Sequence, residues 1–169
     1  YGTASGNYTQ SVDVGNKTSQ TLQGLTEGTR CYLVVVGYDS NRVEGAPSAE
    51  VSGWVLAASS ISSSSLTTTS AVVTWQTNKP ADSQVEYGTT TAYGTLTVLD
   101  NALVTSHSYT LTNLQPATTY QFRVRSKDAG GSILVSANFS FTTTSLADTT
   151  PPGDITQFTA VPGNTMASL

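Results

Sequence analysis

Two stretches of the chain repeat each other and decide its fold. They are Leu25-Thr-Glu-Gly-Thr-Arg-Cys31-Tyr-Leu-Val-Val-Val-Gly-Tyr-Asp39 and Leu114-Gln-Pro-Ala-Thr-Thr-Tyr120-Gln-Phe-Arg-Val-Arg-Ser-Lys-Asp128. The two copies lie 89 residues apart, from the first leucine to the final aspartate. Upstream, Tyr1-Gly2-Thr3 matches Tyr87-Gly88-Thr89 at a spacing of 86 residues. A period near 90 residues is the length of one β-sandwich domain and far exceeds a solenoid repeat.

The composition favours strands over helices. Hydrophobic residues make up 37% of the chain and charged residues only 11%, whereas Ser and Thr together make up about 30%. Threonine, valine and tyrosine suit half-buried pleated surfaces. No window repeats apolar residues at helical spacing over more than two turns. We therefore predict an all-β fold with a packed core.

Residues 55–145 predict one complete sandwich of seven short strands separated by turn sequences. The expected strands are 59–69, 71–77, 82–87, 93–99, 106–114, 120–127 and 136–142. One expected turn is Asn78-Lys79-Pro80, and Gly130-Gly131 is expected in a hairpin between the last two strands. The first strand is expected to carry Ile61 and Leu66, and the side chains expected to face the core include Ala71, Val73, Trp75, Tyr120, Phe122, Val124 and Ser126.

This part of the chain, from about residue 56 to residue 144, resembles a bacterial-type fibronectin type III domain. Trp75 in the second strand and the run Leu114-x-Pro116-x-Thr118-x-Tyr120 carry the resemblance. It implies that Tyr120 is a "tyrosine corner", with a buried ring and a hydroxyl tied back to the preceding turn. Asp82-Ser-Gln-Val-Glu-Tyr-Gly, with the following Thr-rich turn, is also similar to sandwiches appended to secreted phosphatases and polysaccharide-degrading enzymes.

The remaining residues predict two partial copies and a linker. Residues 1–54 match the C-terminal part of a fibronectin type III-like domain, with Cys31 in place of the corner tyrosine. Residues 146–154 form a stiff, Pro-rich linker, and residues 155–169 read as the first strands of a third domain. The expected fold class is therefore all-β, with tandem immunoglobulin-like (fibronectin type III) β-sandwiches, one complete and two partial.

Two explanations of the partial copies remain open. The 169 residues are either a portion of a longer secreted, multi-domain array or a subunit that completes itself with another chain. In the second case the tail of one chain adds strands to the open sandwich of the next and builds a filament. Open sheet edges are an aggregation hazard, so either explanation requires something to cover them.

The sixth strands of the two copies differ on the face that is expected to point outward. In the complete copy this face is charged, with Gln121, Arg123, Arg125 and Lys127. In the partial copy, Cys31, Leu33, Val35 and Gly37 are expected to point inward, and the outward set is Tyr32, Val34, Val36 and Tyr38. An apolar outer face of this kind is either a docking surface for a protein or glycan or an ordinary Tyr-rich face that its neighbours screen.

No combination of residues predicts a catalytic, cofactor or metal site. His107 is the only histidine, so it forms no two-His metal site, and we expect it to face solvent or to bond a turn. Cys31 is the only cysteine, which excludes an internal disulfide and a Cys-based metal cluster. Asp148 and Asp154 flank the linker but are too sparse to predict a calcium site.

Charge and hydropathy narrow the function classes further. The net charge of −4 and pI near 4.6 argue against a nucleic-acid partner, and no apolar run reaches the ~18–20 residues of a membrane span. We therefore expect no enzyme and no cofactor, but a non-catalytic spacer, adhesion or protein-interaction segment, extracellular or at the cell surface. The alternatives are an accessory region of a secreted polysaccharide hydrolase or phosphatase, and a fibre subunit assembled by strand complementation.

Overall fold

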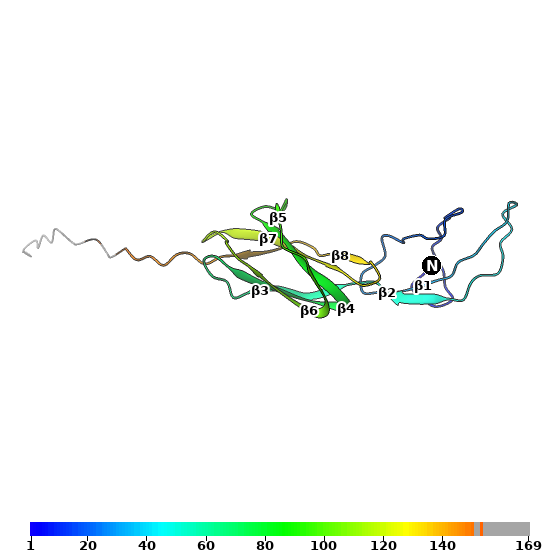
Figure 1. Cartoon of the computed structure of the whole chain (residues 1–169), viewed down its shortest axis with the longest axis horizontal. Helices are drawn as coiled ribbons and strands as arrows, with labels where there is room; N and C mark the ends of the chain where they lie inside the picture. The colour runs from blue at the N-terminus through cyan, green and yellow to red at the C-terminus, as the bar shows by residue number, and fades with distance from the viewer. Residues whose placement is uncertain (151–152, 154–169) are drawn as a thin grey trace, which may run out of the picture.

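The computed structural model describes residues 1–150 and Gly153, and the regular secondary structure of these residues consists only of β-strands (Figure 1). The predicted all-β fold is therefore confirmed. The predicted strands over 155–169, and Pro151, Pro152 and Asp154 of the linker, lie outside the described residues. The strands are β1 Arg30–Leu33, β2 Val51–Trp54, β3 Ala58–Ser64, β4 Ala71–Gly88, β5 Thr95–Leu96, β6 Asp100–Leu111, β7 Thr119–Lys127, β8 Ile133–Val135 and β9 Phe139–Thr142.

β4 runs through both layers of an immunoglobulin-like sandwich. Its first part, residues 71–77, pairs antiparallel with β3 and β6. Its last part, residues 84–88, pairs with β5 and β7, and β7 pairs in turn with β8 and β9. The layers are thus β3-β4-β6 and β5-β4-β7 with β8 and β9, in the two-sheet arrangement typical of this fold. β1 and β2 form a separate two-stranded sheet beside one end of the sandwich (Figure 1).

The prediction of a turn at Asn78-Lys79-Pro80 was wrong, because β4 continues through these residues. The strand bends and changes partners there, and its register against β6 shifts between Gln76 and Ala81. Proline has no N–H to donate, so it is tolerated at such an irregularity. Asn78 N donates to Ala57 O at 3.2 Å, which keeps this backbone paired without a turn.

Four other strand predictions were wrong at their boundaries, and one of them is β6, which runs from Asp100 to Leu111 where 106–114 was expected. β3 ends at Ser64, and Ser65 has a positive φ of 48°, so Leu66 lies outside the strand that was expected to carry it and is exposed. The strand expected over 93–99 shortens to β5. The last strand, expected over 136–142, is shortened to β9, and an additional strand, β8, precedes it; between the two, Val124 N bonds to the Ser136 hydroxyl.

The core of the sandwich follows the predicted alternation. On β7, Tyr120, Phe122, Val124 and Ser126 are buried between residues that are more exposed. Trp75 Nε1 donates to Ser126 Oγ at 3.1 Å, which satisfies both buried polar groups. The buried members of the main cluster are Ala71, Val73, Trp75, Val85, Leu111, Leu114, Tyr120, Phe122, Val124 and Phe141.

Residues 1–54 contain several of the hydrogen bonds of the sandwich at the spacing of the sequence repeat. The backbone pair Gly2–Tyr32 corresponds to Gly88–Gln121 of β4 and β7. The bond from Val35 N to Ser48 Oγ, 3.0 Å, corresponds to that from Val124 N to Ser136 Oγ, also 3.0 Å. The bond from Val43 N to Asp39 Oδ1, 2.9 Å, corresponds to that from Ser132 N to Asp128 Oδ1, also 2.9 Å.

The strand expected over residues 31–38 is much shorter than predicted, because β1 ends at Leu33. Val35, expected to face a core, is 62% exposed, whereas its counterpart Val124 is 0% exposed. In the complete sandwich the opposite layer, β3-β4-β6, covers this face. In the part of the chain that the structure describes, the sheet β1-β2 has two strands, and no opposite layer covers Val35 there.

Candidate functional site

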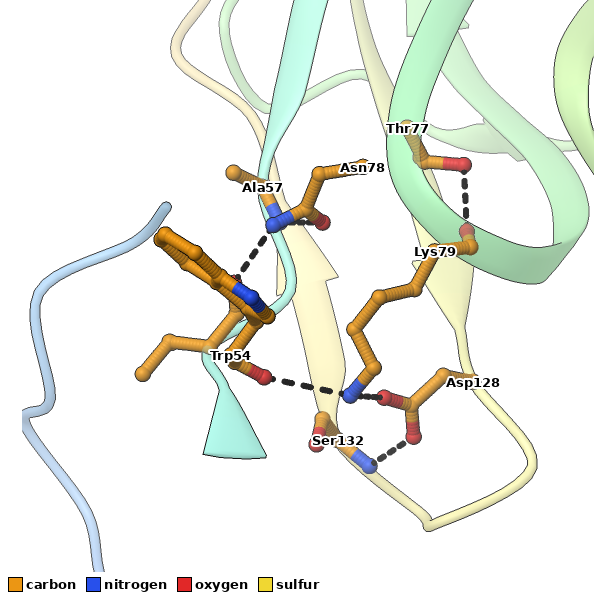
Figure 2. Close-up of polar contacts among 8 residues, drawn as sticks. Trp54, Ala57, Thr77, Asn78, Lys79, Asp128 and Ser132 are labelled. Atoms are coloured by element: carbon orange, nitrogen blue, oxygen red, sulfur yellow. Dashed lines mark hydrogen bonds and ion pairs between the residues drawn. The ribbon is translucent and has the colours of Figure 1, made fainter. Parts of the chain in front are cut away.

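The most elaborate polar arrangement in the described chain lies where the first unit, residues 1–53, meets the complete sandwich. We call this region the joint, and define it as residues 54–57 together with Asn78, Lys79, Asp128 and Ser132 (Figure 2). β2 ends at Trp54 and β3 begins at Ala58, so only three residues connect the two parts. The joint therefore determines how the two parts are connected.

On its upstream side the joint is bonded to the first unit through Val55. Val55 N donates to Thr29 O at 2.8 Å, and Gly28 N donates to Val55 O at 3.2 Å. These bonds extend the pairing of β1 with β2 by one residue beyond Trp54. Val55 is therefore bonded on both of its backbone polar groups to the first unit.

On its downstream side the joint is bonded to Asn78 of β4. The Asn78 side chain accepts a hydrogen bond from Ala57 N at 2.9 Å and donates to Val55 O at 3.0 Å. A carboxamide carries both a donor and an acceptor, so it replaces a peptide group in a strand pairing. Together with the bond from Asn78 N to Ala57 O, it holds the connecting residues in extended form against β4.

Leu56 anchors the connection in the sandwich. Its side chain is only 2% exposed and packs in a small buried cluster with Ala81 of β4 and Leu134 of β8, against which Ala58 also packs. Burial of a leucine side chain contributes about 1.5–3 kcal/mol relative to exposure. The residue between Val55 and Ala57 is thus fixed by packing, as its neighbours are fixed by hydrogen bonds.

An ion pair completes the joint. Lys79 Nζ donates to Trp54 O at 3.2 Å and pairs with Asp128 Oδ2, while Ser132 N donates to Asp128 Oδ1 at 2.9 Å, as Figure 2 shows. Burial acts to raise the pKa of Asp128, but the hydrogen bonds from Lys79 and Ser132 outweigh it and hold this pKa below 3.8. Asp128 is therefore a buried, paired carboxylate, and removal of Lys79 would leave it without its countercharge.

No other polar contact joins the two parts among the described residues. Within 1–150, no hydrogen bond and no ion pair links residues 1–53 directly to residues 58–150. The connection depends on residues 54–57 and their partners. Chemically, the arrangement fixes an extended chain in place through hydrogen bonds to its backbone and one ion pair.

The residues expected to form a partner surface do not lie on one strand. Tyr32 is in β1, half-buried, with the Arg30 guanidinium 5.4 Å from its ring centroid. Val34 and Val36 are half-buried beyond the end of β1. Tyr38 is exposed, and its hydroxyl donates to Asp13 Oδ1 at 2.7 Å.

His107 does not face solvent or bond a turn, as expected from the sequence, but is buried in the sandwich. Its ring stacks on Trp75 at a centroid distance of 4.7 Å, and its two nitrogens bond Thr77 Oγ1 at 2.8 Å and Ser83 Oγ at 2.7 Å. Burial lowers the pKa of His107 below 6.5. The signal was present in the sequence, since His107 has the same parity along β6 as the buried Leu111.

The remaining predicted positions have simple surroundings. The Tyr120 hydroxyl accepts a hydrogen bond from Gln115 N at 2.9 Å, and its ring is buried. Asp148 accepts a bond from Thr150 N at 2.8 Å. Within the described part of the chain, no group of three or more His, Cys, Asp or Glu residues is placed to hold a metal ion. Nor does that part contain a helix long and apolar enough to cross a membrane.

The joint itself was missed from the sequence. An apolar run, Trp54-Val-Leu-Ala-Ala58, follows the first copy and marks the position. Its partners, however, lie more than 20 residues away and were interpreted as a turn and a hairpin. A local pattern gives no indication that Asn78, Lys79 and Asp128 gather around this run.

Comparison with solved structures finds several β-sandwich domains. The sensor domain of the anti-sigma factor RsgI4 from Pseudobacteroides cellulosolvens shares 20% identity over 54% of this chain and 97% of that chain, with a TM-score of 0.43. A redesigned β-sandwich protein shares 33% identity over 53% of this chain and 96% of that chain, with a TM-score of 0.42. A fibronectin type III domain of human fibronectin type III domain containing protein 3 shares 19% identity over 56% of this chain and 91% of that chain, with a TM-score of 0.43.

Comparison with curated proteins gives no match. A family model, the purple acid phosphatase N-terminal domain, matches residues 58–143, which is 86 of the 169 residues and just over half of the chain. The matched segment begins with β3 and ends one residue after β9, so it coincides with the complete sandwich. Through this sandwich, the chain belongs to the family of purple acid phosphatase N-terminal domains.

Proposed function

We propose that the chain is a non-catalytic spacer and interaction segment of a multi-domain protein, extracellular or at the cell surface. The joint carries this proposal, because each of the three connecting residues is fixed by a hydrogen bond or by burial. Domains joined by free linkers move independently by default. A connection in which every residue is held by a hydrogen bond or by burial keeps its two units in one orientation, as a spacer requires.

The domain boundaries and partner classes belong to the same proposal. Residues 1–54 act as the C-terminal part of one domain, 55–145 as a complete domain, and 146–154 as a linker to a third domain that begins in 155–169. The net charge of −4 disfavours nucleic acid, so the partner is a protein or a glycan. Tyr32, Val34, Val36 and Tyr38 are the proposed contact residues.

Two measurements test this function. Backbone ¹⁵N relaxation of the whole chain should give one rotational correlation time for residues 1–57 and 58–145, because the joint couples them. A clearly shorter time for residues 1–53 would contradict the spacer. For the contact residues, Val34→Thr with Val36→Thr should weaken binding to a cell-surface extract, and binding unchanged from the parent chain would remove that surface from consideration.

A second candidate is an accessory region of a phosphatase, and the family match favours it. In this case the sandwich accompanies a catalytic domain that is not among residues 1–169. The full reading frame tests this directly, because a metal-dependent phosphatase domain in the same frame supports it. A frame that contains only further sandwich domains contradicts it and leaves the spacer.

A third candidate is a self-assembling fibre subunit, and the bare face of the first unit favours it. Val35 is 62% exposed where Val124 is 0% exposed, so among the described residues this position of the first unit lacks the cover that it has in the complete sandwich. Sedimentation velocity of the 169-residue chain should then show concentration-dependent oligomers, which disappear when residues 155–169 are deleted. A monodisperse monomer would exclude the fibre.

A further inference from the structure

The sandwich contacts the connecting residues through their main chain. Four hydrogen bonds join residues 54–57 to Asn78 and Lys79, and in each of them the atom contributed by residues 54–57 is a backbone N or O. Two come from the Asn78 side chain, one from Asn78 N, and one from Lys79 Nζ. Backbone groups are the same in every sequence, so these bonds do not depend on which side chains the connecting residues carry.

Only one side chain of the connection is buried in the sandwich. Leu56 is 2% exposed, whereas Trp54 is 55% exposed and Val55 and Ala57 are half-buried. The position that corresponds to Trp54 at the end of the complete sandwich is Thr142, since Trp54 pairs with Arg30 as Thr142 pairs with Thr119. A last strand of this fold therefore does not need a tryptophan there.

The body of the first unit is not recognised by polar contacts. As described above, no hydrogen bond or ion pair joins residues 1–53 directly to residues 58–150. The units touch through an extended strand end and not through complementary charged surfaces. Residues 1–53 therefore act on the sandwich through the strand end that they hold, and not through polar contacts of their own.

We infer that the sandwich has a binding site for a strand end, which we call the socket. It consists of Asn78, Lys79, Asp128 and the pocket of Ala81 and Leu134. The socket binds the backbone of its partner and accepts the last strand of any preceding sandwich unit. The requirements on the partner are an extended chain and one apolar residue in the place of Leu56. This inference rests on the proposed spacer function and extends it, because it makes the preceding unit exchangeable. Its specificity is for the conformation of the partner strand, as in other cases of strand addition.

The acidic part of the socket recurs in the first unit. Asp39, the counterpart of Asp128, accepts a hydrogen bond from Val43 N at 2.9 Å, as Asp128 does from Ser132 N. Both loops also close with a bond to the aspartate carbonyl at 3.0 Å, from Arg42 N and Gly131 N. The two loops therefore have the same hydrogen-bonded geometry, at positions related by the sequence repeat.

Four single variants of the whole chain test the socket, with ¹⁵N relaxation and amide residual dipolar couplings as readouts. Leu56→Ser and Asn78→Ala should abolish the shared correlation time of the two units and shrink the couplings of residues 1–53. Trp54→Thr and Val55→Thr change the neighbouring side chains but keep the backbone bonds, and should leave both readouts as in the parent chain. Amide chemical shifts of β7 report whether each sandwich stays folded.

The outcomes separate the socket from the spacer. Independent tumbling in the parent chain overturns both proposals. The socket alone is overturned if the two units of the parent chain share one correlation time but Trp54→Thr or Val55→Thr separates their motion as much as Leu56→Ser does. The side chains of the connecting residues would then be recognised as well as the backbone. A rigid parent in which Leu56→Ser and Asn78→Ala stay rigid also overturns the socket alone. If Leu56→Ser fails to fold, Asn78→Ala decides, since it removes bonds near the surface and no core side chain.

Discussion

Leu56→Ala should destabilise the sandwich strongly, although Leu56 lies in the connection between two units. The side chain is 2% exposed and packs with Ala81 and Leu134, and the substitution removes three carbon atoms. At about 0.8 kcal/mol for each buried carbon, the lost transfer free energy is roughly 2.5 kcal/mol. A residual cavity adds to this, so we expect a total cost of about 3 kcal/mol, in the lower half of the range of Leu→Ala substitutions.

Urea unfolding followed by the fluorescence of the buried Trp75 measures this cost, and a drop in Tm of roughly 12–24 °C should accompany it for a domain of this size. Leu146→Ala is the matched control, because Leu146 is 69% exposed and lies after β9. It should change the free energy of unfolding by less than about 0.5 kcal/mol. If Leu56→Ala costs no more than Leu146→Ala, the connection is not anchored in the sandwich and the reasoning about the joint fails.

Three further predictions concern the sandwich itself. Burial lowers the pKa of His107 below 6.5, so the unfolded chain binds its proton more readily; stability should be complete above pH ~6.5 and fall as the pH drops towards the lower pKa of the folded state, in urea titrations between pH 7 and 5. Tyr120→Phe leaves Gln115 N without its acceptor and should cost about 1–3 kcal/mol in the same assay. Gly88→Ala would drive a Cβ into the backbone carbonyl of Tyr93 and should lower Tm by more than 5 °C, since about 1–3 kcal/mol of overpacking is expected.

Each of these has its own control. His107→Leu removes the only histidine, and the loss of stability between pH 7 and 5 should disappear with it; a slope that persists contradicts the assignment. Tyr109→Phe removes a hydroxyl whose bond to Val98 O is exposed, and should cost less than Tyr120→Phe. Gly53→Ala places a Cβ with no atom within 4 Å, so an effect as large as that of Gly88→Ala would count against the steric argument.

Much of the sandwich could be predicted because its determinants are local. The two-residue period of Tyr120, Phe122 and Val124 is a property of any half-buried strand, and the structure buries all three. The repeat at 89 residues made the comparison of two copies possible before any coordinates. The prediction of a buried face failed in the partial copy, where the described residues form no opposite layer. Val35 follows the same alternation but is exposed to solvent, because its burial would need a second sheet.

The joint could not be predicted, because its contacts join residues that are distant along the chain. Asn78-Lys79-Pro80 has the composition of a turn, and by local propensity alone a turn is the correct expectation. Pairing with Ala57, 21 residues earlier, keeps these residues in β4 instead. Tertiary context overrides propensity when distant backbone groups supply the hydrogen bonds that a turn would otherwise make.

The sequence by itself determined the all-β class, the repeat, the core-facing side chains of Ala71, Val73 and Trp75 and of the 120–126 strand, and the acidic charge. These follow from side-chain hydrophobicity and spacing, which the chain carries in any conformation. Only the tertiary structure decided that β4 is one strand, that His107 is a core residue, and that Leu56, Asn78 and Asp128 meet in a joint. A hydrogen bond or a buried contact is a property of two partners, and chain order does not say which distant groups will lie within 3 Å of each other.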